Sequence, residues 1–229
     1  MIIRLLIVFY VLTLNIFAQS NLDKGIEYYN RRHENCIEDR ADPVYITKAI
    51  SFFESCLNDQ KTKVVASLYL LKSYYFKAKF TESDKEKKKE ILKKGKALGQ
   101  DLIEEYPESV DYIYWYLVNL GSWAEVYGVL SAAREGVADK MRTYSKKIIE
   151  MDPNYEDGAG YFLLGAVHYK SPYIPFILSW PSNSDAIKWL ELAYNTGESK
   201  IAQAVYLAMA YEKDGEQNKA IELLDKVMS

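Results

Sequence analysis

The clearest pattern of apolar and polar positions lies at the carboxy-terminal end of the chain. In residues 199–228, apolar side chains recur at three- and four-residue spacing in two blocks, separated by the turn sequence Lys213-Asp214-Gly215. This spacing places the apolar side chains of each block on one face of a helix. The pattern therefore predicts two short antiparallel helices joined by a tight turn.

This pair of predicted helices carries the signature of a tetratricopeptide repeat. The positions that such a repeat gives to a leucine, a small residue, a tyrosine, a second small residue and a bulky residue hold Leu207, Ala208, Tyr211, Ala220 and Leu224. Small residues at a helix crossing allow the two axes to approach to about 8–10 Å, and larger side chains fill the grooves beside the crossing. The carboxy-terminal segment therefore resembles one tetratricopeptide repeat.

Three earlier parts of the chain carry the same signature. The matching positions, in chain order, are Gly25, Tyr28, Ala49, Phe53 and Cys56, then Leu70, Leu71 and Tyr74, then Leu164, Gly165, His168, Ala186, Leu190 and Ala193. Extra residues separate the paired helices of several repeats, so the repeats are irregular. We therefore expect an all-α, tetratricopeptide-repeat-like solenoid of about four to five antiparallel helix pairs, formed by residues 20–229.

The first twenty residues have the layout of a secretory signal peptide. Arg4 gives a positive start, an apolar run extends from Leu5 to Ile16, and Ala18 is a small residue before a cleavage position. We expect residues 1–19 to be a signal peptide and the protein to be periplasmic or secreted. A retained membrane anchor is the alternative, although the run is shorter than the roughly 20 residues of a spanning helix. No cysteine follows the run, so no lipid-modified amino terminus is expected.

The charge of the chain bears on nucleic-acid binding, and its two cysteines bear on a possible disulfide. The formal net charge of −3 gives no reason to expect nucleic acid, because phosphate binding needs a clustered basic face. The lysines of residues 83–96 are interspersed with glutamates, as on the solvated face of a helix. Cys36 and Cys56 are candidates for a disulfide in an oxidising compartment, but their spacing does not decide whether they pair.

No motif for catalysis or metal binding occurs in the sequence. His33 precedes Cys36 by three residues, but the further ligands of a metal site are missing. The sequence DGAG at residues 157–160 lacks the glycine spacing of a dinucleotide loop, and no phosphate loop or nucleophile elbow is found. We therefore expect a non-enzymatic protein without a cofactor or a metal.

An aromatic stretch in the middle of the chain is the first candidate for a binding site. Residues 114–130, YWYLVNLGSWAEVYGVL, predict a helix that is apolar nearly all round and that ends or kinks at Gly121-Ser122. Such a helix needs cover on both sides. Its aromatic residues either pack in the core or line a cavity for a ligand, and the candidates are Trp115, Tyr116, Trp123 and Tyr127.

A loop with three prolines is the second candidate. Residues 171–184, SPYIPFILSWPSNS, carry no charge, and their prolines exclude a continuous helix. Exposing their apolar side chains to water would cost about 1.5–3 kcal/mol each, so the loop is expected to pack against something. Either it closes over its own groove, or it forms the rim of a hydrophobic pocket or a partner-docking patch; the candidates are Pro172, Tyr173, Pro175, Phe176 and Trp180.

About the last two-thirds of the chain resembles the T component of tripartite ATP-independent periplasmic (TRAP) transporters, with the motifs that carry the resemblance in residues 114–195. The resemblance rests on the tyrosine and tryptophan helix, an aspartate-proline before a glycine-bearing helix, and the proline loop, at Trp115, Gly121, Trp123, Gly158, Gly165 and Pro172. It implies a periplasmic accessory protein of helix pairs that self-associates, contains a groove or channel, and pairs with a TRAP solute-binding component. It also implies binding of a hydrophobic small molecule.

Two functions therefore remain at the level of the sequence. In the first, the aromatic helix and the proline loop enclose a hydrophobic small molecule between them. In the second, the protein is a cell-envelope scaffold whose groove docks a peptide or a protein partner.

Overall fold

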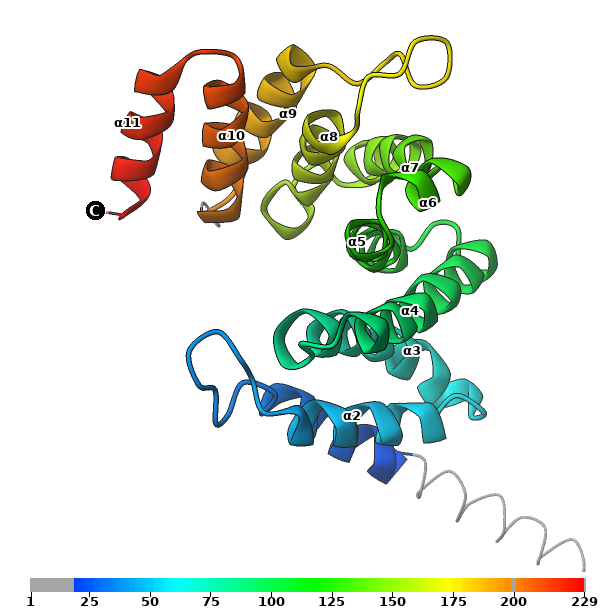
Figure 1. The fold of residues 1–229 in the computed structure, drawn as a ribbon. Helices are drawn as coiled ribbons and strands as arrows, with labels where there is room; N and C mark the ends of the chain where they lie inside the picture. The colour runs from blue at the N-terminus through cyan, green and yellow to red at the C-terminus, as the bar shows by residue number, and fades with distance from the viewer. Residues whose placement is uncertain (1–18, 199–200, 229) are drawn as a thin grey trace, which may run out of the picture. The chain divides into compact units, whose positions relative to one another are not determined.

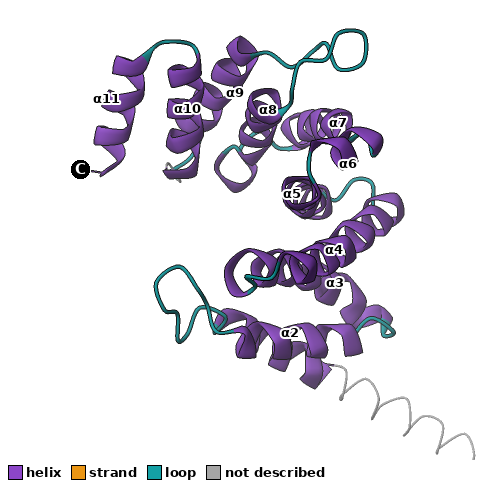
Figure 2. Ribbon diagram, viewed as in Figure 1, coloured by secondary structure: helices purple, strands orange, loops and turns teal. Residues whose placement is uncertain are grey.

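The computed structural model describes residues 19–198 and 201–228, and this part of the chain is helical throughout apart from turns and loops (Figures 1 and 2). The predicted signal peptide lies outside the described residues except for its last position. No helix among the described residues is long and apolar enough to span a membrane.

The long helices follow one another as five consecutive pairs, which confirms the predicted repeat architecture. The pairs are residues 19–30 with α2 (Pro43–Ser55), α3 (Gln60–Phe76) with α4 (Lys85–Glu105), α5 (Val110–Tyr127) with α7 (Val137–Met151), α8 (Ala159–Lys170) with α9 (Asn183–Asn195), and α10 (Ile201–Lys213) with α11 (Gln217–Met228). Three short elements lie between them: a π-helical turn at Lys77–Thr81, α6 at Val129–Arg134, and a 3-10 turn at Tyr155–Asp157.

Short polar side chains set the starts of several helices. The Asp42 carboxylate accepts a hydrogen bond from the Val44 backbone N–H, and Pro43 occupies the first turn of α2. Ser182 caps α9 in the same way by accepting from the Asp185 N–H. Such caps satisfy backbone donors that the helix itself leaves unpaired, and each is worth about 1 kcal/mol.

The chain forms two compact units that share α5. Unit 1 comprises residues 1–107 and 118–127, and unit 2 comprises residues 108–117 and 128–229. In unit 1, Phe53 is fully buried beneath Gly25, where a side-chain carbon would lie only 2.5 Å from the Phe53 ring. In unit 2, Gly165 packs on Leu190 just as closely, at 2.6 Å. The small positions of the repeat signature are therefore the helix crossings, as the sequence predicts.

Helix α5 is continuous, which corrects the prediction that it ends or kinks at Gly121-Ser122. The hydroxyl of Ser122 donates to the carbonyl oxygen of Val118 at 2.8 Å, within the helix itself. The chain leaves the helix only at Gly128, whose φ of +90° is a conformation that favours glycine. Gly128 therefore provides the break that the sequence analysis assigned to Gly121.

The two candidate cysteines, Cys36 and Cys56, are not paired with each other in the structure. Cys36 lies exposed in the loop after the first helix, and its thiol donates to the carbonyl oxygen of His33 at 2.8 Å. Cys56 follows α2 and is completely buried in the core of unit 1. The two thiols are not bonded to each other, because one side chain faces solvent and the other fills a small-residue position at a helix crossing.

Candidate functional site

A cluster of aromatic rings lies on the first helices of the last two pairs. Phe162 and Tyr169 come from α8 and Tyr206 from α10, and all three are half-buried. The Tyr206 ring meets the Phe162 ring edge-on at 5.1 Å between centroids, and it meets the Tyr169 ring at 6.3 Å. We call these three residues the α8–α10 aromatic surface. Edge-on contacts of this kind hold the rings in fixed orientations.

Two lysines border the α8–α10 aromatic surface. The Lys170 ammonium lies 5.3 Å from the centre of the Tyr206 ring, and the Lys213 ammonium lies 5.0 Å from the centre of the Tyr169 ring. Lys213 also donates to the Tyr169 carbonyl oxygen at 3.4 Å. Cation–π contacts at such distances place positive charge beside the rings. The surface therefore combines apolar ring area with two ammonium groups at its edge.

An exposed apolar stripe on α10 continues this surface. Ile201, Val205 and Met209 follow one another at four-residue spacing, and their side chains are 72%, 42% and 39% exposed. Residues at this spacing lie on one side of a helix, and Met209 shares that side with Tyr206, three residues before it. The opposite side of α10 is buried against its neighbours. A partner chain with apolar side chains would find a complementary surface here.

A similar ring geometry occurs in unit 1. Tyr29 and Tyr69 meet edge-on at 5.1 Å, and the Arg32 guanidinium lies 4.1 Å from the Tyr29 ring and 5.3 Å from the Phe76 ring. Tyr29 comes four residues after the signature glycine Gly25.

The two tyrosine pairs occupy equivalent repeat positions. Tyr169 likewise comes four residues after its signature glycine, Gly165, and both Tyr69 and Tyr206 lie directly before the signature leucine of their helix. The tyrosine pair is therefore a repeated feature. The repeat signature does not reveal this pair, because the signature covers only the core positions of the repeats.

Two of the aromatic candidates on α5 lie in unit 2. Tyr116 is only 1% exposed and meets Tyr144 of α7 edge-on at 5.9 Å. Trp115 is half-buried and contacts the neighbouring Tyr114 ring at 5.3 Å. Tyr116 is therefore a core residue, the first of the two roles that the sequence left open.

The other two candidates on α5 lie in unit 1, beneath the lysine face of α4. Trp123 is 5% exposed and stacks on Tyr127 at 4.4 Å between centroids. The ammonium of Lys96 lies 4.1 Å from the Trp123 ring centre, and that of Lys89 lies 5.6 Å from the Tyr127 ring centre. Part of the predicted solvated lysine face thus covers these rings, since long lysine side chains pack along apolar surface while their charge stays in water.

The proline loop forms a finger between α8 and α9, which we call the proline finger, residues 171–181 (Figure 1, yellow). Ile174 and Leu178 exchange backbone hydrogen bonds of 2.9 and 2.8 Å across it. At its tip, the side chains of Tyr173, Phe176 and Ile177 are 64%, 103% and 78% exposed. Pro172 and Pro175 beside them are exposed as well. The tip does not close over a groove of its own, the first of the two alternatives for this loop, because its side chains are exposed to solvent.

Only the base of the proline finger is packed. The Trp180 indole N–H donates to the Asp139 carboxylate at 2.8 Å, and the Trp180 ring lies between the Arg142 guanidinium, at 4.7 Å, and the His168 ring, at 4.8 Å. Pro181 is buried. Burial lowers the pKa of His168. The negative charge of Asp185 raises this pKa, and the positive charges of Arg142 and Lys146 lower it further. His168 of α8, in the tyrosine position of its repeat, thus contacts the base of the finger.

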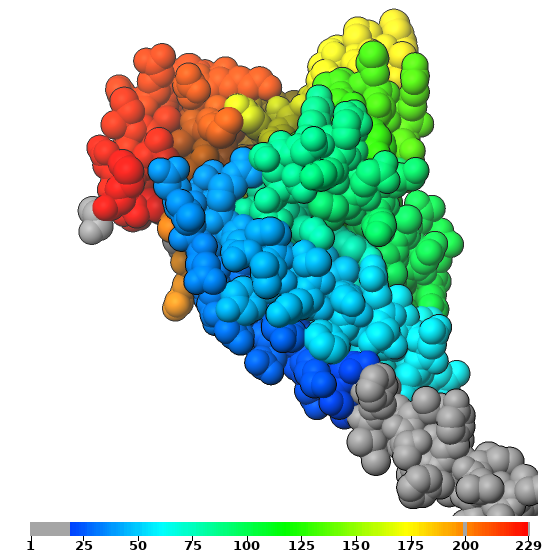
Figure 3. Space-filling model, turned by 60° about the horizontal axis from the view of Figure 1, so that its bottom comes forward, coloured from blue at the N-terminus to red at the C-terminus, as the bar shows by residue number. Residues whose placement is uncertain are grey.

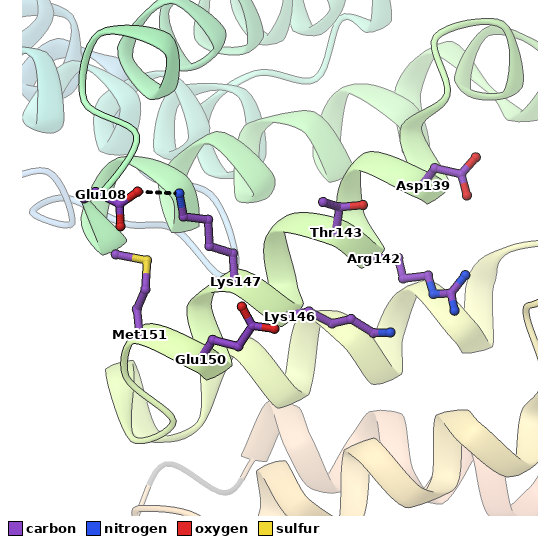
Figure 4. Close-up of a pocket in the computed structure, with 8 residues that line it drawn as sticks. All are labelled: Glu108, Asp139, Arg142, Thr143, Lys146, Lys147, Glu150 and Met151. Atoms are coloured by element: carbon purple, nitrogen blue, oxygen red, sulfur yellow. Dashed lines mark hydrogen bonds and ion pairs between the residues drawn. The ribbon is translucent and has the colours of Figure 1, made fainter.

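An open groove runs along the exposed side of α7 (Figure 4). Its volume is about 570 Å³, and its lining residues are Glu108, Asp139, Arg142, Thr143, Lys146, Lys147, Glu150 and Met151. Lys147 is paired with Glu108 at 2.9 Å. The groove is lined by three acids and three bases, and no group of acids, histidines or cysteines in the described part of the chain has the arrangement of a metal site. The groove is a polar surface and differs from the hydrophobic pocket that the sequence suggested.

These features define a class of protein: an all-α protein of tetratricopeptide-repeat-like helix pairs. The sequence profile of the family described as regulator of microtubule dynamics protein 1-3 matches residues 37–229, and the chain belongs to this family.

The fold has a counterpart among solved structures. A mutant form of MamA is similar over 93% of this chain and 96% of that chain, with a TM-score of 0.52 and 15% sequence identity. At this identity the likeness concerns the fold alone. No curated protein matches the chain. The resemblance to the T component of TRAP transporters is tested by none of these comparisons and stays a prediction.

Proposed function

We propose that the protein is a non-catalytic scaffold that binds a segment of a partner protein on the α8–α10 aromatic surface. The observation that carries this proposal is the exposed apolar stripe of Ile201, Val205 and Met209 beside three ordered rings. A folded domain seldom leaves such a stripe uncovered next to aromatic residues, which are enriched in protein interfaces.

The chemistry of the surface indicates what the partner segment carries. Apolar side chains of the partner pack against the stripe, and an amphipathic helix presents such side chains at the same four-residue spacing. Lys170 and Lys213 favour carboxylates at the edge of the contact. We therefore propose an amphipathic segment with acidic residues on its flank. The family description, which refers to regulation of microtubule dynamics, supports a protein as the partner.

Site-specific crosslinking tests this proposal. A photoreactive amino acid is placed at Val205 of α10 in the full chain, and at Ile221 of α11 as a control that is also exposed, at 59%. The same partner is expected to crosslink at Val205 and not at Ile221. Val205→Glu in an otherwise unmodified chain is expected to abolish recovery of that partner. Equal crosslinking at both positions, or unchanged recovery with Val205→Glu, contradicts the proposal.

The sequence resemblance to TRAP T components supports a second candidate: an exported accessory protein that binds a hydrophobic small molecule or a solute-binding component. Its support lies in residues 114–195, including Trp115 and Pro172. Native mass spectrometry of the purified protein, followed by lipid extraction, is expected to reveal a bound apolar molecule in this case. Loss of that mass in Trp115→Ala would place the molecule beside α5, and its absence from the wild type would remove this candidate.

A further inference from the structure

The proline finger is an uncharged projection with its most apolar residues at the far end. Phe176 and Ile177 form the tip, and residues 171–181 contain no acid and no base. In the space-filling view the yellow atoms of the finger form an edge of the surface (Figure 3). Burial of these side chains would be favourable, yet no described residue of the chain covers them. The finger is therefore suited to enter another apolar phase.

Phe176, at the tip, has a strained backbone conformation as well as a fully exposed side chain. Its φ is +65°, in the left-handed region that bulky side chains rarely adopt. Such outliers persist only where surrounding structure enforces them, and they concentrate at functional positions. Here the enforcing structure is the pair of backbone hydrogen bonds between Ile174 and Leu178. The geometry holds the ring outward.

The base of the finger is fixed to unit 2. Trp180 is held by Asp139, Arg142 and His168, as described above. The Ser182 backbone N–H, just after the finger, donates to Nδ1 of His168 at 3.3 Å. Because the base is already rigid, insertion of the tip would immobilise few further rotatable bonds. The loss of conformational entropy on binding is therefore small, which favours binding.

Two cations, Arg142 and Lys146, lie near this base, together with the carboxylates of Asp139 and Asp185. Among the described residues, Arg142 and Lys146 form no ion pair with a carboxylate, and both act on His168. Of the nearby acids, Asp139 accepts from Trp180 and Asp185 accepts from the Ser182 hydroxyl at 2.7 Å, and Glu150 lines the same groove as both cations. None of these carboxylates forms an ion pair with Arg142 or Lys146 among the described residues, so both cations can reach an external anion.

We propose that the proline finger inserts into the interfacial layer of a lipid bilayer, with anionic headgroups held by Arg142 and Lys146. The order of chemistry along the finger matches the order of depth in a membrane: apolar side chains at the tip, a hydrogen-bonded tryptophan at the base, and cations behind it. An apolar pocket on a protein would not require a tryptophan and cations to follow the apolar tip in this sequence. This surface is separate from the α8–α10 aromatic surface, so it stands independently of the proposed protein partner.

An environment-sensitive fluorophore on the finger tests the insertion. The full chain carries Tyr173→Cys and Cys36→Ser, so that the label reaches only residue 173; Cys56 is 0% exposed and is not labelled. The matched control is the wild-type chain labelled at its native Cys36, in an exposed loop of unit 1. Vesicles of phosphatidylcholine, with and without phosphatidylserine, are added to each. A local label reports the finger even if residues 1–18 also bind the vesicles.

The expected result is a blue shift and a rise in emission at residue 173 and none at Cys36, strongest with phosphatidylserine. Phe176→Ser with Ile177→Ser is expected to weaken vesicle binding about tenfold or more, since two apolar side chains lose their burial. Arg142→Gln and Lys146→Gln are each expected to weaken vesicle binding about fivefold, and only when the vesicles contain phosphatidylserine. Circular dichroism verifies that each variant is folded.

Three results would overturn the proposal. The first is an unchanged label at residue 173 with both kinds of vesicle in the folded protein, which would point to a protein pocket as the occupant of the finger. The second is an equal response at Cys36. The third is wild-type binding by the Phe176→Ser, Ile177→Ser variant.

Discussion

Unit 1 and unit 2 carry the same tyrosine pair at the same repeat positions, but the helix surfaces beside the two pairs differ in exposure. When Tyr69 of α3 is aligned with Tyr206 of α10, the three stripe residues of α10 correspond to three residues of α3. Ile201, Val205 and Met209 align with Val64, Leu68 and Lys72, respectively. Val64 is 44% exposed, whereas Ile201 is 72% exposed. Leu68 is half-buried, whereas Val205 is exposed. The apolar part of the stripe is therefore better covered in unit 1 than in unit 2.

The last stripe position differs in chemistry as well. Lys72 stands on α3 where α10 has Met209, and its ammonium lies 5.6 Å from the centre of the Tyr69 ring. A lysine covers apolar surface with its methylene groups and keeps its charge in water. The stripe of unit 1 thus ends in a charge beside its tyrosine, whereas the stripe of unit 2 stays apolar past Tyr206. The comparison shows that the same repeat position can close a surface or leave it open to a partner.

The other cations beside the pairs also differ. In unit 1 the guanidinium of Arg32 lies over two rings, and its Nε is buried. In unit 2 two ammonium groups lie at the edge of the rings. Tyr69 also stacks on the core residue Phe53 at 5.1 Å. Both tyrosine pairs pack against the core of their unit, so the two units differ in the cations and the stripe beside the pair.

The largest expected effects come from the residues beneath the signature glycines. Phe53→Ala in unit 1 and Leu190→Ala in unit 2 each remove a fully buried side chain, and each is expected to lower the free energy of unfolding by about 2–5 kcal/mol. Urea denaturation followed by circular dichroism measures this loss. Ile37→Ala, at a position that is 77% exposed, is the control and should change stability by less than about 0.5 kcal/mol. A loss below about 1 kcal/mol for either core variant would show that these crossings are not the core of the repeats.

Exchanging the residues at the last stripe position tests the comparison itself. Met209→Lys gives α10 the residue of α3, and we expect partner binding to fall about tenfold because a charge would have to leave water within an apolar contact. Stability should change little, since Met209 is already 39% exposed. Crosslinking yield and thermal unfolding measure the two effects.

The reverse exchange in unit 1 is the matched control. Lys72→Met alters the same repeat position on α3, and it is expected to leave partner binding unchanged because the partner contacts α10. Retained binding in Met209→Lys would show that the stripe of α10 is not the contact. An equal loss in both variants would assign the effect to the repeats in general.

Substituting the cations beside the tyrosine pairs is expected to give a smaller difference between the two units. Arg32→Ala is expected to cost about 1–2 kcal/mol of folding stability, because it removes packing against two rings as well as the charge. Lys213→Ala should cost less stability and instead weaken partner binding. Unfolding curves and binding curves for both variants separate these effects, and equal stability losses would contradict the difference between the units.

The smallest expected effect concerns pH. The tyrosine position of the signature holds Tyr74 in unit 1 and His168 in unit 2, and an imidazole titrates near neutral pH. The folded state lowers the pKa of His168 below its ordinary value of 6.5, and the unfolded chain therefore takes up the proton first as pH falls. Stability should accordingly decline between pH 6.5 and the lowered value. In His168→Asn, this part of the pH dependence of the unfolding midpoint is expected to disappear; its persistence would assign the decline to other groups.

The repeat signature was sufficient to predict the architecture because it reports helix crossings. Gly25, Gly165 and the residues packed on them are fixed by steric fit, and steric fit is visible as residue size at a regular spacing. The continuous helix at Gly121 was not predictable in the same way, since glycine is tolerated inside a helix when its neighbours pack well. The sequence shows a glycine but not the packing around it.

The binding candidates were harder to predict because residue type does not determine exposure. Tyr116 and Phe176 are both aromatic residues in apolar stretches, yet one is buried and the other is fully exposed. The α8–α10 aromatic surface escaped attention because its tyrosines lie beside the signature positions. Comparing Tyr29 with Tyr169 would have revealed the repeated pair from the sequence, whereas the greater exposure of the α10 stripe is visible only in the structure.

The sharing of α5 has a consequence for dissecting the protein. A cut before residue 108 deprives unit 1 of Trp123 and Tyr127, and a cut after residue 127 deprives unit 2 of Tyr116. Neither half can thus be expressed as a complete piece, and fragments made at these borders would lose part of their own interior. The protein is better studied by single substitutions than by truncation.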